Sequence, residues 1–193
     1  MNTGQVLLVL AAFTILSVLT LGWNRTTCGT IELGLEMEAT LNALSIGQSM
    51  LDEVMTKGFD QKTIGGTVAY NYSQLTPPSS LRPEAGEAIT GIDSAYTSGG
   101  TFHDFQSKSK FNDVDDYNLY HRKVYDPRMG YFDVFDTVKY VSEFTPGKDT
   151  TSATFYKKII VVVTHPSLPK AGPNDTRTTP IVVRDIAIYR QYF

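Results

Sequence analysis

The N-terminal part of this chain lacks two kinds of residue. No proline occurs before Pro77, and no charged residue occurs before Arg25. A proline would break a helix in its interior, and an unpaired charge is costly in an apolar environment. The two absences therefore allow one long helix near the N-terminus, and they allow its first part to lie in an apolar environment.

Cysteine and histidine are also scarce, and no enzyme motif is present. The one cysteine, Cys28, cannot form an intrachain disulfide, and we expect its thiol to be a small buried group. The three histidines are far apart, and HExxH, CxxC, GxSxG, Walker and GxGxxG motifs are missing. The net charge of −3 is unlike that of a nucleic-acid-binding protein. We therefore predict neither an enzyme, nor a transition-metal site, nor a nucleic-acid partner.

A long apolar run occupies the N-terminus. Residues 6–23 read VLLVLAAFTILSVLTLGW, and about 18 such residues suffice to cross a bilayer as a helix. No Lys or Arg precedes the run and no small-x-small cleavage site follows it, which argues against a cleaved secretory signal. A membrane anchor, or a helix that packs among other apolar helices, remains.

The helical pattern continues to about Lys57, which predicts one helix of roughly 50 residues, about 75–80 Å long. Its apolar residues form two stripes: Leu33, Met37, Leu41, Leu44, Leu51 and Met55, and Ala39, Ala43, Ile46, Met50 and Val54. A helix on the surface of a monomer needs only one stripe. Two stripes suit a helix between its own domain and neighbouring subunits, or a helix buried deeply in its own domain.

Glycines predict the irregular points of this helix. Gly22, Gly29 and Gly34 each cost about 0.5–1 kcal/mol relative to alanine, so we expect a kink or a melted segment within residues 21–34. Lys57 followed by Gly58 predicts the end of the helix, with the glycine in the left-handed conformation.

Beyond the helix the pattern becomes extended. Residues 65–72 predict a short strand, and residues 131–144, 155–165 and 181–193 predict three longer ones. These last three should pair as an antiparallel meander, with the helix across one face.

The predicted fold class is therefore α+β, with a long N-terminal helix packed on a C-terminal antiparallel sheet. We divide the chain into a hydrophobic membrane or filament-core helix (residues 1–23), an amphipathic continuation (residues 24–58) and a globular β-rich head (residues 59–193).

One loop of the head is a candidate cation site. Asp113, Asp115, Asp116 and Asn118 place four oxygen-bearing side chains within a short segment, and Ca²⁺ takes 6–8 oxygen ligands. The segment lacks the glycine and the late glutamate of an EF-hand. The alternative is a turn in which these side chains cap their own backbone.

Three segments resemble those of type IV pilins and pseudopilins. The start, MNTGQVLLVLAAFTILSVL, resembles a mature pilin N-terminus after removal of the leader. Residues 45–61, SIGQSMLDEVMTKGFDQ, resemble the end of a pilin stalk helix. Residues 111–120, FNDVDDYNLY, resemble the DVDDYNG stretch in the heads of some minor pilins, such as those of mannose-sensitive haemagglutinin pili.

The resemblance implies a structural subunit of an extracellular filament. Such a subunit is held in the inner membrane before assembly. The pilus assembly machinery then adds it to identical subunits in a helical homopolymer. The N-terminal helices form the filament core and the heads form its surface. The residues implied in assembly are Met1, Gln5, Val6, Leu7, Leu8, Leu10, Phe13, Leu16, Leu19 and Leu21.

Two features depart from the family pattern. Pilins usually carry a glutamate where this chain has Gln5, and no basic leader precedes Met1. A glutamine keeps a hydrogen bond to a neighbouring subunit but loses the charge-assisted one. Met1 is then either a processed end or the initiator. A minor pseudopilin of a secretion system and a single-span membrane-anchored binding protein remain as alternatives.

Overall fold

The computed structural model describes residues 2–96, 100–172 and 175–190, and it divides into two units, Met1–Glu38 and Ala39–Phe193. We describe each unit by itself. The helix α1 is Thr3–Met55 and α2 is Gln106–Lys110. Four short 3₁₀ helices occupy Gln61–Thr63, Tyr72–Gln74, Pro78–Ser80 and Asp115–Tyr117.

The glycines do not interrupt α1. The structure shows continuous helix through Gly22, Gly29 and Gly34, so the predicted melted segment is wrong for this structure. The hydroxyls of Thr26 and Thr27 are paired within the helix, because each donates to the carbonyl four residues earlier, at 3.0 and 2.9 Å. An isolated glycine costs only about 1 kcal/mol relative to alanine, which an otherwise continuous helix of 53 residues tolerates.

Two other local predictions on α1 are corrected. Gly58 follows the helix as expected, but its φ is not positive, and its amide instead donates to the Asn112 carbonyl at 3.0 Å. A tertiary contact therefore replaces the left-handed cap. Cys28 is exposed rather than buried, because it lies in the first unit, where the described side chains are nearly all exposed.

The strands form one five-stranded sheet in the order β1-β2-β3-β4-β5. Their bounds are Asp93–Ser94, His121–Asp126, Gly130–Tyr140, Tyr156–Thr164 and Ile181–Ile188. Strands β2 to β5 pair antiparallel with their neighbours, and the short β1 pairs parallel with β2. The predicted meander is confirmed as β3, β4 and β5, and the α+β fold class is confirmed.

The sequence pattern was misleading in two places. Residues 65–72 contain no strand: Gly65 and Gly66 adopt positive φ at the start of the segment, and the 3₁₀ helix Tyr72–Gln74 begins at its end. The strand β2 was not predicted, because its six residues, HRKVYD, are largely polar. It forms because β3 supplies a full antiparallel partner, from the pair His121 and Phe135 to the pair Asp126 and Gly130.

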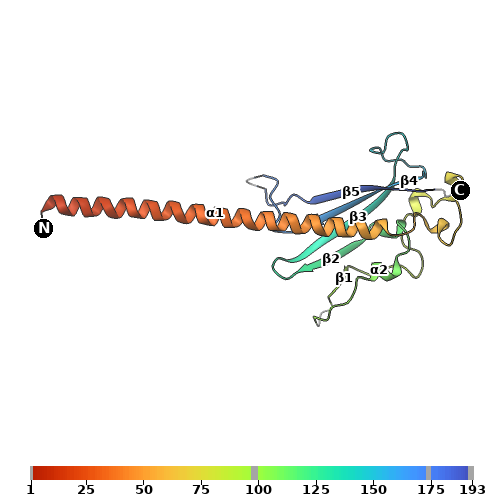
Figure 1. Cartoon of the computed structure of the whole chain (residues 1–193), viewed down its shortest axis with the longest axis horizontal. Helices are drawn as coiled ribbons and strands as arrows, with labels where there is room; N and C mark the ends of the chain where they lie inside the picture. The colour runs from red at the N-terminus through yellow and green to blue at the C-terminus, as the bar shows by residue number, and fades with distance from the viewer. Residues whose placement is uncertain (1, 97–99, 173–174, 191–193) are drawn as a thin grey trace. The chain divides into compact units, whose positions relative to one another are not determined.

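The C-terminal part of α1, within the second unit, crosses one face of the sheet (Figure 1). Its buried residues are Ala39, Ala43, Gly47, Met50, Leu51 and Val54. They pack on alternate residues of the central strands, Phe132, Val134, Val138, Ile159, Val161 and Val163. The stripe that begins at Ala39 therefore faces the head, as the spacing predicted.

At Gly47, α1 packs tightly against the sheet. A β-carbon added there would lie 2.9 Å from a Val183 methyl group and 3.4 Å from a Val163 methyl group. Gly34, in the same helix, has no heavy atom within 4 Å of the equivalent point. The two glycines therefore provide a matched pair, one needed for packing and one not.

We expect Gly47→Leu to lower the free energy of unfolding by about 1–3 kcal/mol, because the added side chain overpacks the contact with β5. Gly34→Leu should leave the unfolding transition of the head unchanged. Urea unfolding of the full chain in detergent, followed by circular dichroism, measures both. Equal transitions for the two variants would contradict this packing.

Candidate functional site

The apolar run of α1 is exposed around its whole circumference. The proposed assembly residues from Val6 to Leu21 have exposed fractions between 42% and 72%. Gln5 lies in the first turn of α1 and is also exposed, whereas Met1 lies outside the described residues. In the described part of the chain, α1 is the helix that is long and apolar enough to cross a membrane. A helix that is apolar on all sides needs either lipid or other apolar helices around it.

The hydroxyl groups within this run are satisfied inside the helix. Thr14, Ser17 and Thr20 donate to the carbonyls of Ala11, Phe13 and Leu16, at 2.8, 2.8 and 3.0 Å. Burying an unpaired hydroxyl in an apolar environment costs a few kcal/mol. Since these groups are already paired, the run can enter an apolar environment without that cost.

A second apolar stripe of α1 stays exposed beyond the membrane-length run. Its members are Leu33, Met37, Leu41, Leu44 and Met55, with exposed fractions from 42% to 64%. Of the predicted stripe, only Leu51 is buried against the head. We call these five exposed residues the free stripe.

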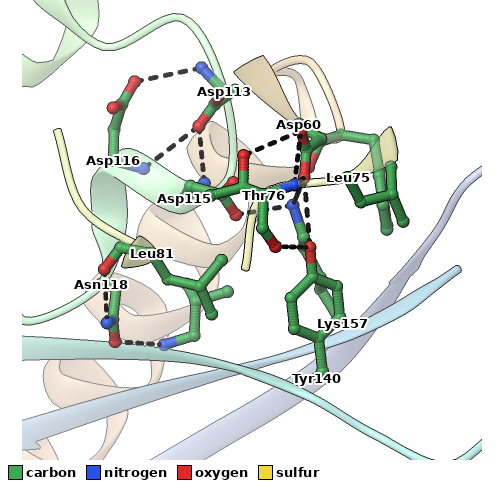
Figure 2. Close-up of polar contacts among 12 residues, drawn as sticks. Asp60, Leu75, Thr76, Leu81, Asp113, Asp115, Asp116, Asn118, Tyr140 and Lys157 are labelled. Atoms are coloured by element: carbon green, nitrogen blue, oxygen red, sulfur yellow. Dashed lines mark hydrogen bonds and ion pairs between the residues drawn. The ribbon is translucent and has the colours of Figure 1, made fainter. Parts of the chain in front are cut away.

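The acidic loop (residues 113–118) is a tightly bonded turn. Asp113 accepts the amides of Asp115 and Asp116 through one oxygen, at 2.7 and 3.2 Å. Asp116 in return accepts the amides of Asn112 and Asp113, at 2.9 and 3.2 Å (Figure 2). Backbone capping is therefore a real role of these aspartates, as the alternative interpretation held.

A buried lysine holds one side of this loop. Lys157 of β4 is fully buried, and its ammonium group lies 2.8 Å from Asp60 and 2.6 Å from Asp115. It also donates to the Phe59 carbonyl at 2.7 Å. Figure 2 shows this group beside Tyr140, whose hydroxyl lies 3.1 Å from the Asp60 carboxylate.

The two aspartates that share Lys157 respond differently. Burial alone would raise the pKa of Asp60, but the Lys157 charge and several hydrogen bonds outweigh it, so the pKa is lowered. Burial dominates at Asp115, and its pKa rises to about 6 in spite of Lys157. The attraction of Lys157, with the hydrogen bonds at Asp60, therefore outweighs burial at Asp60 but does not outweigh it at Asp115.

The four predicted cation ligands do not come together as one set. Asn118 is committed to the backbone, since its amide donates to the Leu81 carbonyl at 2.8 Å and accepts the Val138 amide at 3.1 Å. Asp115 is paired with Lys157. Asp113 and Asp116 remain, and the structure brings Glu84 to them, with one oxygen of each within 4.8 Å of the others.

This group of carboxyls has strongly shifted pKa values. Burial and the charges of Asp115 and Asp116 raise the pKa of Asp113 to about 8. Burial and the neighbouring carboxyls of Glu87 and Asp116 raise the pKa of Glu84 to about 7. Like charges at close range disfavour full ionisation, so the group attracts either protons or a cation.

Sequence reasoning missed Glu84, Glu87 and Lys157. The first two lie in a proline- and glycine-punctuated loop far from residue 113, and no local pattern links the two segments. Lys157 did carry a signal, because it shares the buried face of its strand with Ile159. A lysine on a buried face must find an acidic partner.

A further ion pair ties α1 to the head. Glu53 lies 2.8 Å from Arg122 of β2 and accepts hydrogen bonds from Ser107 and Tyr117, at 2.8 and 3.0 Å. Burial would raise the pKa of Glu53, but Arg122 and these donors together lower it. The last turns of α1 are therefore fixed to the sheet by charge as well as by packing.

Comparison with models of protein families, with curated proteins and with solved structures gave no match. The functional interpretation therefore depends on the residues and geometry of this chain.

We expect Lys157→Met to lower the free energy of unfolding by about 3–5 kcal/mol, because it leaves Asp60 and Asp115 buried without their cation. Lys158→Met is the matched control. Lys158 pairs with the partly exposed Asp149, so its replacement should lower the free energy of unfolding by no more than about 1 kcal/mol. Urea unfolding of the full chain tests both. A small loss for both variants would show that Lys157 is not essential to the acidic loop.

Proposed function

We propose that this chain is a structural subunit of a type IV pilus-like extracellular filament. In this account the apolar helices of identical subunits form the filament core, and the heads form its outer surface. Before assembly, the same apolar run holds the subunit in the inner membrane. The resemblance of three segments to pilins suggests this function, and the two-sided apolar character of α1 supports it.

The free stripe is the observation that carries the proposal. A membrane tether needs only the run of residues 6–23, because lipid covers that part alone. In the free stripe, Leu33, Met37, Leu41 and Leu44 follow one another at helical spacing beyond the run and stay exposed, and Met55 lies farther along, past the buried Leu51. Contiguous exposed apolar residues mark an interaction surface. Neighbouring helices of the same kind would cover both the run and the free stripe.

The apolar run is suited to close helix packing. Ala11, Ala12 and Gly22 offer small surfaces where backbones can approach, and no charge has to be buried. Gln5 in place of the usual glutamate weakens the contact between subunits at the N-terminus, which suits a minor or divergent subunit. A pseudopilin that primes a short filament uses the same surfaces and differs in filament length.

A substitution in the free stripe distinguishes two proposed functions of this chain, a filament subunit and a tethered binding protein. We expect Leu33→Asp to leave the amount of chain in the membrane fraction unchanged, because residue 33 lies outside the run. The same variant should lower the yield of sheared filaments about tenfold or more, since burying a carboxylate between subunits costs well over 1.4 kcal/mol. Immunoblots of sheared and membrane fractions measure both quantities.

The control is Leu33→Ala, which shortens the side chain without adding a charge and should assemble. Filaments at normal yield from Leu33→Asp would contradict the placement of the free stripe between subunits. A chain whose biological activity persists in cells that cannot assemble filaments would instead be a tethered binding protein.

A further inference from the structure

The carboxyls near the acidic loop carry more negative charge than their surroundings balance. Glu84, Asp113 and Asp116 each bring one carboxylate oxygen within 4.8 Å of the others, and Glu87 accepts a hydrogen bond from the side chain of Asn112, which precedes Asp113. Lys157 is already shared by two other aspartates. Among the residues that the structure describes, no Lys, Arg or His forms an ion pair with any of the four.

A second observation does not depend on charge. Asp113 and Asp116 are both fully buried, and each uses only one carboxylate oxygen to cap the loop. The other oxygens, Oδ2 of Asp113 and Oδ1 of Asp116, are buried and have no hydrogen-bond partner in the described chain. One oxygen of Glu84 is in the same state. Buried polar atoms are nearly always paired, so these three oxygens call for a ligand that accepts their lone pairs.

The spacing of the three carboxylates fits a single metal ion. One oxygen from each of Glu84, Asp113 and Asp116 lies within 4.8 Å of the others. Two oxygens on opposite sides of a Ca²⁺ ion are about 4.6–5.2 Å apart, because each Ca–O distance is 2.3–2.6 Å. We propose that Glu84, Asp113 and Asp116 bind one Ca²⁺ ion, with Glu87 beside them to complete the negative charge.

Calcium fits these ligands better than other divalent cations. The group offers carboxylate oxygens from two separate loops and no histidine or cysteine, which excludes the donor set of a zinc site. Mg²⁺ demands a nearly ideal octahedron at 2.0–2.1 Å, whereas Ca²⁺ accepts irregular sets and bidentate carboxylates. A cavity of about 280 Å³ lies beside Asp116, and Arg82 and His121 also line it.

The ion would join two loops of the head. Glu84 and Glu87 belong to a turn in which the Glu87 amide donates to the Glu84 carbonyl at 3.1 Å, with Gly86 at a positive φ. Asp113 and Asp116 belong to the acidic loop. A cation between them replaces mutual repulsion by attraction, so its effect is on the stability of the head and is separate from filament assembly.

Thermal unfolding of the full chain in detergent tests the site. With CaCl₂ at about 100 times its Kd, we expect the Tm to rise by about 5 °C or more over a solution with EDTA and NaCl at equal ionic strength. MgCl₂ should give a much smaller shift. An equal Tm in all three solutions would overturn the proposal and leave protons as the groups that neutralise the carboxyls.

Asn variants test whether the Ca²⁺ shift in Tm needs these carboxylates in a chain that still folds. Asp113→Asn and Asp116→Asn can each keep the oxygen that caps the loop and replace the unpartnered one by an amide, so the chain should fold in EDTA and lose the Ca²⁺ shift. Asp104→Asn, at an exposed acid outside the site, is the control and should keep the full shift. Where an Asn variant fails to fold, Glu84→Gln, in a partly exposed loop, serves instead. A full Ca²⁺ shift in the folded variants would place the ion elsewhere.

Discussion

The packing of one stripe of α1 on the sheet determines what the rest of this molecule can do. Ala39, Ala43 and Gly47 are small enough to bring the helix close to β4 and β5. The stripe that begins at Ala39 forms the core with the sheet, and the free stripe lies on another side of the helix and stays exposed. After residue 38 the head thus buries Ala39, Ala43, Gly47, Met50, Leu51 and Val54, while Leu41, Leu44 and Met55 stay exposed.

Polar contacts fix the same helix and the loop that follows it. Glu53 meets Arg122 near the end of α1, and Asp60, just after the helix, meets Lys157. Removing one partner of such a buried pair strongly destabilises a protein, while an intact pair contributes little net stability. Glu53 thus connects the last turns of α1 to β2, and Lys157 connects Asp60 to Asp115 of the acidic loop. Lys157 pairs with Asp60 and Asp115, whereas the carboxylates that we assign to Ca²⁺ belong to Glu84, Asp113 and Asp116.

The fold could be predicted from the sequence where periodicity was strong. The long helix, its two stripes and the strands β3 to β5 all follow from regular apolar spacing, which reports burial directly. The strand β2 could not be predicted in this way, since its partner β3 and not its own composition makes it extended. The helical glycines misled because isolated glycines, at about 1 kcal/mol each, do not interrupt a long helix. In the acidic loop, Asp113 and Asp116 were found, but Glu84 was not, because only the tertiary fold brings it near.

The central claim is that residues 6–23 and the free stripe pack between copies of this chain. Cryo-electron microscopy of appendages sheared from cells that produce the chain tests this claim most directly. The account predicts helical filaments whose density fits the chain, with the apolar run of α1 at the axis and the head outside. Finding the chain only in the membrane fraction, with no filament that contains it, would contradict a major structural role.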